Sequence, residues 1–128
     1  MEKLIYERTQ STPLVFFDYI NKILTIEGVS LPENAKEFYS VVHDFIENYH
    51  EDDITIIHDL GYANSSSSKN ILELLKKSIR NVRRVNIRWF YDEDDTDILE
   101  TGEDIQDILG IKFEFIPKKR PRKLFYDY

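Results

Sequence analysis

The spacing of apolar residues changes several times along the chain, and each change marks the boundary of a predicted element. Short segments in which apolar and polar residues alternate, or apolar runs bounded by turn residues, are typical of strands. Asn21-Lys22 is the predicted turn between the second and third strands, because Asn tolerates a left-handed backbone. The predicted strands are residues 4–6, Leu14–Tyr19, Ile23–Glu27, Ile54–Leu60, Val85–Tyr91 and Lys112–Ile116.

Three segments instead repeat their apolar residues every three or four positions, which is typical of amphipathic helices. The first lies within residues 30–52, with Pro32 near its start. The second runs from about Ser65 to Asn81, and the third from about Asp97 to Leu109, where Gly110 is expected to form the C-cap. The apolar face of the first helix is predicted to consist of Phe38, Val41, Val42, Phe45, Ile46 and Tyr49.

The order of these elements predicts the fold class. Three strands come first, and helices then alternate with the remaining strands, which indicates right-handed crossovers between parallel strands. The opening hairpin adds antiparallel strands. We therefore predict an α/β (α+β) domain with a single mixed β-sheet of five to six strands and three helices packed on it.

Length and composition are consistent with one globular domain. The chain has 128 residues, of which 41% are apolar, and this is enough to bury a core. We expect a single domain over residues 1–128, with its core at about 4–116 and a basic, aromatic tail at 117–128. The chain has no cysteine, which excludes disulfides and thiolate metal sites. No apolar run approaches the ~20 residues that cross a bilayer, so we expect a cytoplasmic protein.

Charge is distributed unevenly. The formal net charge of −7 argues against nucleic acid or a membrane as the main partner, since both attract a positive surface. Residues 92–104 carry eight acidic and no basic side chains, whereas residues 118–123 carry five basic and no acidic ones. Opposed patches of this kind favour the selection of protein partners.

The segment between the fourth strand and the second helix contains four consecutive serines, Ser65 to Ser68. Asn64 or Ser65 can act as the N-cap, but a cap needs only one such residue. A phosphoryl group is a natural use for the remaining hydroxyls, because free N–H groups and the helix dipole favour a dianion there. Lys69, one turn further, adds a positive charge. The alternative from these residues alone is a polar loop with an ordinary cap.

Several separated motifs resemble the SiaC family of bacterial regulatory phosphoproteins. Their order and spacing over about residues 12–116 carry the resemblance, since each motif alone is weak. The motifs are T-P-L-V-F-F-D at Thr12–Asp18, the block Ile26–Asn34, Y-A-N-S-S-S-S-K at Tyr62–Lys69, W-F-Y-D-E-D-D at Trp89–Asp95, and E-T-G-E-D at Glu100–Asp104.

The resemblance implies a fold similar in outline to anti-sigma-factor antagonist (STAS-like) domains. It also implies a partner switch: a protein kinase phosphorylates the protein, a PP2C-type phosphatase reverses this, and the unmodified form binds and stimulates a diguanylate cyclase. The family's acceptor threonine follows the Asn and therefore corresponds to Ser65. This chain departs from the family pattern there, with Ser for Thr, and at Ala63, where an aromatic residue is usual.

Other sequence features bear on possible chemistry. The acidic run from Asp92 lacks the Gly and Glu of an EF-hand loop, and we interpret it as a helix-entry loop or partner surface. His43, His50 and His58 lack the spacing of a zinc site, and we expect surface or partly buried side chains. No nucleophile elbow or phosphate-binding glycine loop occurs, so we predict no enzyme and no cofactor. The predicted partner surface comprises Tyr62, Tyr91, Asp92, Glu93, Asp94 and Asp95.

Two hypotheses follow from the sequence. The first is a switch in which phosphate on Ser65, flanked by Asn64, Ser66, Ser67, Ser68 and Lys69, changes the partner that is bound. The second is a constitutive adaptor domain that binds through the acidic 92–104 patch, while the serines only cap a helix. For the basic tail, we predict a plain solvated extension rather than contact with nucleic acid or an acidic partner.

Overall fold

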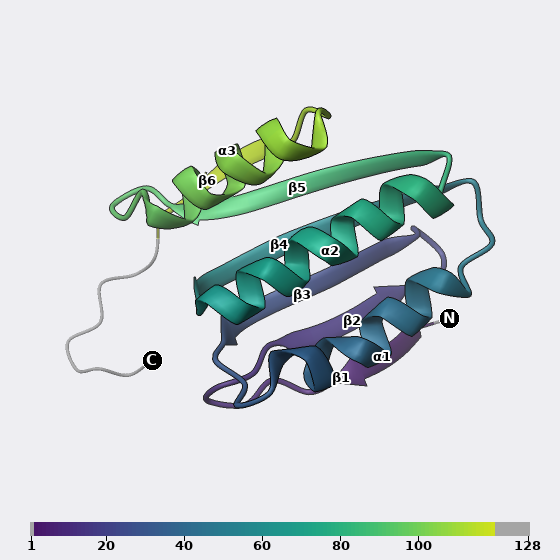
Figure 1. Cartoon of the computed structure of the whole chain (residues 1–128), viewed down its shortest axis with the longest axis horizontal. Coiled ribbons are helices and arrows are strands. Elements are labelled where there is room, and N and C mark those ends of the chain that lie inside the picture. The colour runs from purple at the N-terminus through teal and green to yellow at the C-terminus, as the bar shows by residue number, and fades with distance from the viewer. Residues whose placement is uncertain (1, 120–128) are drawn as a thin grey trace.

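The computed structural model describes residues 2–119 and contains one six-stranded sheet and three helices (Figure 1). The predicted fold class and the predicted order of elements are confirmed. The elements are β1 (Glu2–Tyr6), β2 (Leu14–Asp18), β3 (Ile23–Ser30), α1 (Ala35–Glu47), β4 (Asp53–Ala63), α2 (Ser65–Asn81), β5 (Arg84–Asp92), α3 (Asp97–Leu109) and β6 (Glu114–Lys118).

The strands lie in the sheet in the same order as in the chain, from β1 to β6. β2 is antiparallel to both of its neighbours, β1 and β3, whereas β3, β4, β5 and β6 are mutually parallel. A helix connects each parallel pair. Right-handed crossovers between successive neighbours place their helices on the same side, and Figure 1 shows all three on the near side of the sheet. The far side has no helical layer within residues 2–119.

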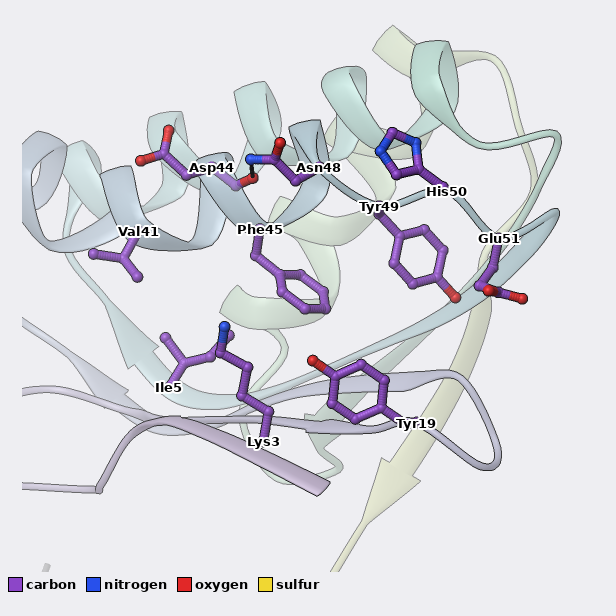
Figure 2. A pocket seen from close by; sticks show the side chains of 10 residues that line it. All are labelled: Lys3, Ile5, Tyr19, Val41, Asp44, Phe45, Asn48, Tyr49, His50 and Glu51. Atoms are coloured by element: carbon purple, nitrogen blue, oxygen red, sulfur yellow. Dashed lines mark hydrogen bonds between the residues drawn. The ribbon is translucent and has the colours of Figure 1, made fainter. Parts of the chain in front are cut away.

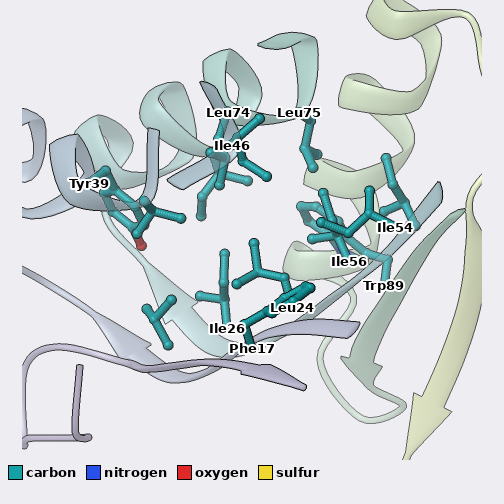
Figure 3. Close-up of a cluster of buried hydrophobic side chains, with 14 of the residues drawn as sticks. Phe17, Leu24, Ile26, Tyr39, Ile46, Ile54, Ile56, Leu74, Leu75 and Trp89 are labelled. Carbon is teal, nitrogen blue, oxygen red and sulfur yellow. The ribbon is translucent and has the colours of Figure 1, made fainter. Parts of the chain in front are cut away.

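The core lies between this sheet and the helices (Figure 3). Alternate residues of each central strand face the helices, as the burial pattern of β3 and β4 shows. On α1, Val42 and Ile46 are buried as predicted, but Val41 is 45% exposed and Tyr39 is fully buried in its place. The prediction for Val41 was therefore wrong. The side of α1 that packs on the sheet includes Tyr39 and leaves Val41 facing solvent.

The turn between β2 and β3 differs from the predicted two-residue turn. β2 ends at Asp18, so four residues connect the strands, and Lys22 rather than Asn21 adopts the left-handed backbone with a φ of 57°. The Asp18 carboxylate accepts hydrogen bonds from the backbone N–H groups of Ile20 and Asn21 at 3.0 and 3.2 Å. These bonds hold the wider turn closed.

Strand ends also differ from the sequence prediction. β3 and β4 pair beyond an irregularity at Gly28, through Val29 with Tyr62, and so run further than expected. β6 begins two residues later than predicted, because the Phe113 N–H donates to the side chain of Gln106 at 2.8 Å instead of joining the sheet. β6 includes Pro117, which an edge strand tolerates since its outer side needs no donor.

Candidate functional site

The parallel strands bring the predicted site residues to one edge of the sheet. β3, β4, β5 and β6 all run in the same direction, so their C-terminal ends lie along a common edge, which we call the carboxyl edge. The first turn of α2 follows β4 directly, and the acidic loop before α3 follows β5 (Figure 1). Ligands and partners of α/β sheets commonly bind at such an edge.

The first turn of α2 is capped by Asn64. Its side-chain oxygen accepts from the Ser67 N–H at 2.9 Å and its backbone oxygen from the Ser68 N–H at 3.0 Å. The Ser66 hydroxyl donates to the same side-chain oxygen at 3.2 Å. The structure thus selects Asn64 from the two candidate caps, and the Ser65 hydroxyl takes no part in capping.

The four serines have different environments. Ser65 and Ser66 are exposed, Ser68 is half-buried, and Ser67 has no exposed surface. The Ser67 side chain extends the buried face of α2, four residues before Ile71, into the interior. A kinase can reach the hydroxyl of Ser65 or Ser66 without moving the helix, whereas Ser67 is inaccessible in the folded chain.

Ser67 belongs to a buried network of hydroxyl groups below the helix tip. Its hydroxyl donates to the backbone oxygen of Ser30 at 3.1 Å and lies 2.8 Å from the Ser30 hydroxyl. The Ser30 hydroxyl in turn lies 2.7 Å from the Tyr39 hydroxyl. Burial raises the pKa of Tyr39 to about 12, so the phenol remains a neutral hydrogen-bonding group. The network joins the starts of α1 and α2 to the end of β3.

This network was missed at the level of sequence. Ser30 and Tyr39 were not among the predicted site residues, although they determine how the α2 tip is held. One signal was present: counting back one helical turn from Ile71 along the second helix leads to Ser67. No comparable pattern links Ser30 to Tyr39, because their contact depends on how α1 packs against β3.

The electrostatics of the α2 tip favour an added anion. The N–H groups of Ser65 and Ser66 have no acceptor among residues 2–119, and they lie at the positive end of a 17-residue helix. The first turn contains no acidic side chain. Lys69 is exposed and has no ion-pair partner in the part of the chain that the structure describes. The α2 tip therefore offers an anion unpaired N–H donors and an exposed cation one turn further along the helix.

The predicted partner surface is only partly exposed. Tyr62 is 57% exposed and Glu93, Asp94 and Asp95 are exposed, whereas Tyr91 and Asp92 are half-buried. The acidic loop is an ordered turn, in which the Asp92 carboxylate accepts from the Asp94 N–H at 2.9 Å. Within residues 2–119, no group of three acidic or histidine side chains is arranged to hold a metal ion. The structure thus presents these acids as a surface at the carboxyl edge, which also holds the α2 tip.

A separate hollow of about 520 Å³ lies between β1, α1 and the turn after β2 (Figure 2). Lys3 and Ile5 reach into it from β1, and Phe45 and Val41 reach into it from α1. None of the predicted site residues lines this hollow. The candidate site is therefore the surface of the carboxyl edge and not a cavity.

His58 differs from the expectation of a surface or partly buried side chain. It is 2% exposed and stacks on Trp89, with ring centroids 3.5 Å apart and planes within 3°. Its Nδ1 atom has no hydrogen-bond partner among the described residues, and burial lowers the pKa of His58 to about 3. The expectation was wrong because His58 alternates with Ile54, Ile56 and Leu60 and so faces the core. A neutral, enclosed imidazole is a core residue here.

The fold and the carboxyl edge define a class of protein: a one-sided mixed α/β domain that presents a serine-rich helix tip beside an acidic loop. The model of the SiaC family, described as "SiaC family regulatory phosphoprotein", matches residues 6–118. The chain belongs to this family. The resemblance noted from the sequence motifs is thereby confirmed.

Relatives and solved structures agree with this assignment. An uncharacterised protein of Pseudomonas aeruginosa (strain UCBPP-PA14) is 32% identical over 119 residues, covering 88% of this chain and 94% of the relative. Apo-SiaC from Pseudomonas aeruginosa is similar with a TM-score of 0.75 and 29% identity, over 91% of this chain and 98% of that chain. SiaC in complex with the diguanylate cyclase SiaD, which it activates, is similar with a TM-score of 0.75 and 30% identity, over 87% of this chain and 96% of that chain.

Among residues 2–119, no helix combines the length and the apolar character needed to span a membrane.

Proposed function

We propose that this chain is a partner switch controlled by phosphorylation of Ser65. A Ser/Thr kinase adds the phosphoryl group, a PP2C-type phosphatase removes it, and the unmodified form binds and stimulates a diguanylate cyclase. The chain itself is a regulator in this scheme and catalyses no step. The cytoplasm, which supplies ATP to the kinase and GTP to the cyclase, is the compartment that the proposal requires.

The observation that carries the proposal is the contrast between Ser65 and Ser67. Ser65 is exposed, makes no capping hydrogen bond and has free N–H groups beside it, whereas Ser67 is fully buried. Phosphate on Ser65 can therefore change the charge of the surface without disturbing the fold, which is what a reversible modification needs. The known complex of a family member with a diguanylate cyclase supports the choice of effector.

The effect of the phosphate follows from the charges at the carboxyl edge. The α2 tip has no acidic residue in its first turn, while the neighbouring loop carries Glu93, Asp94 and Asp95. A dianion on Ser65 extends the negative surface of that loop across the tip. A partner whose docking surface fits a neutral tip then meets both repulsion and added bulk.

A first prediction concerns the acceptor. When the chain is expressed in its native organism, the wild-type protein is expected to carry one phosphoryl group. The Ser65→Ala protein is expected to carry none. Intact-mass measurement and fragmentation of the phosphopeptide locate the group. Ser66→Ala, which alters the adjacent exposed hydroxyl, is the matched control and should stay phosphorylated.

The result that removes Ser65 from this role is specific. Phosphate found on Ser66 or Ser68 in the Ser65→Ala protein, at the level of the wild type, assigns the modification to another hydroxyl. Loss of phosphate from both alanine variants indicates instead that the kinase recognises the whole serine run.

A further inference from the structure

The face of the sheet opposite the helices, which we call the open face, carries large apolar side chains among polar ones. A sheet face in contact with water normally carries polar residues between its apolar ones. Here Phe16, Ile57, Phe90 and Ile116 all point to the open face and are half-buried by one another's strands. Phe90 and Ile116 are directly opposite each other on β5 and β6. Thr25 lies between Phe16 and Ile57, and Arg88 lies next to Ile57, so the apolar side chains are interleaved with polar ones. Large apolar side chains that no second layer covers still offer contact area to a binding segment.

Two acidic side chains lie side by side near the centre of this face. Glu27 and Asp59 are paired in register on β3 and β4, so their carboxylates lie side by side on the open face. Glu27 has no ion-pair partner within residues 2–119. The Asp59 side chain is 12% exposed, so its charge is partly removed from water. A segment that binds here can therefore supply a cation to Glu27 together with large apolar side chains.

One cation of the chain already reaches these acids. Lys118, the last residue of β6, extends back over the open face, with its Nζ atom 2.7 Å from the Asp59 carboxylate. On the way it passes over the ring of Phe90, 5.6 Å from the ring centroid. Lys118 is also the first residue of the basic run 118–123. The basic run thus starts on the open face.

We propose that the open face is a docking surface for the chain's own residues 119–128. This segment has the required chemistry, since its four bases at 119, 120, 122 and 123 are followed by Leu124, Phe125 and Tyr126. Its bases complement Glu27 beside Asp59, and its aromatic residues complement Phe16 and Ile57. The segment replaces the missing layer on this side of the sheet.

The length of the segment is sufficient. Four strand spacings separate β6 from β2, which amounts to about 19 Å at ~4.8 Å per spacing. Ten extended residues span about 33 Å at ~3.3 Å per residue. The segment can therefore cross from Lys118 to Phe16 with residues to spare. It also lies beyond residue 118, where the match to the family ends, so the inference does not rest on the switch at Ser65.

Spin labelling of the full chain tests this proposal. The chain has no cysteine, so Asp127→Cys places a single nitroxide in the segment without removing a base or an aromatic ring. The label is expected to broaden the methyl NMR signals of Ile57 and Ile116 far more than that of Ile108, which is 59% exposed on α3. Glu27→Lys should restore most of the lost intensity. Glu103→Lys, an equal charge change on the exposed side of α3, should not.

Three results overturn the proposal. Ile57 broadened no more than Ile108 places the segment away from the open face. Broadening that appears only when the label and the observed methyls are on different molecules assigns the surface to a second copy. Broadening that is unchanged by Glu27→Lys excludes recognition through the acidic pair.

Discussion

Ser67→Asp is expected to unfold the chain or to lower its free energy of unfolding by about 3–5 kcal/mol. The Ser67 side chain has no exposed surface, and its hydroxyl donates to the Ser30 backbone oxygen. An aspartate there puts an unpaired negative charge beside a carbonyl oxygen, in a site closed to water. Total stabilities are of the order of 5–15 kcal/mol, so the loss is a large part of the whole.

Ser65→Asp is the matched control, because it makes the same change two residues away. Ser65 is exposed at the positive end of α2, where an acidic side chain contributes about 0.3–1 kcal/mol of stability. We therefore expect Ser65→Asp to unfold at the same or a slightly higher urea concentration than the wild type. Equal stability of the two aspartate variants contradicts the assignment of Ser67 to the interior and of Ser65 to the surface.

A second large effect is expected from pH. Burial lowers the pKa of His58 to about 3 in the folded chain, against about 6.5 when it is unfolded. Below pH 6.5 the unfolded chain thus binds a proton at His58 that the folded chain does not bind. The free energy of unfolding is therefore highest above this pH and decreases as the pH falls. The loss between pH 7 and pH 5 is about 2 kcal/mol. Urea unfolding at several pH values measures it.

Substitution of single histidines identifies the one that causes the pH dependence of stability. His58→Phe keeps an aromatic ring against Trp89 and should remove most of the slope between pH 7 and pH 5, whatever its absolute stability. Burial also lowers the pKa of the half-buried His43, which leaves a smaller slope in the same direction. A slope that survives in His58→Phe indicates that His58 is not the group that titrates.

The fold could be predicted from the sequence where the signals are local. The limits of α2 and α3 follow from Asn64 at one end and Gly110 at the other, since cap residues act within a single turn. The parallel half of the sheet follows from alternating strands and helices. Strand ends were less predictable, because pairing beyond Gly28 and the late start of β6 depend on contacts between distant residues.

The candidate site was predictable only in part, because its sequence signals are also local. The sequence places a run of serines at a helix start, and the resemblance selects Ser65, but neither separates exposed from buried hydroxyls. That separation comes from the rotation of α2 about its axis, which is fixed by how Ile71 and Leu74 pack. The link from Ser67 through Ser30 to Tyr39 joins three elements, and no local pattern indicates it.

Phosphate on Ser65 is expected to abolish the stimulation of a diguanylate cyclase by this chain. Phosphoserine can be placed at position 65 by codon reassignment, which makes the test independent of the kinase. The measured quantity is the rate at which a diguanylate cyclase from the same cell forms cyclic di-GMP. The unmodified chain and Ser65→Ala are expected to raise this rate, and the phosphoserine-65 chain is expected to leave it at the level of the cyclase alone. Equal stimulation by the phosphorylated and unmodified chains would contradict the account.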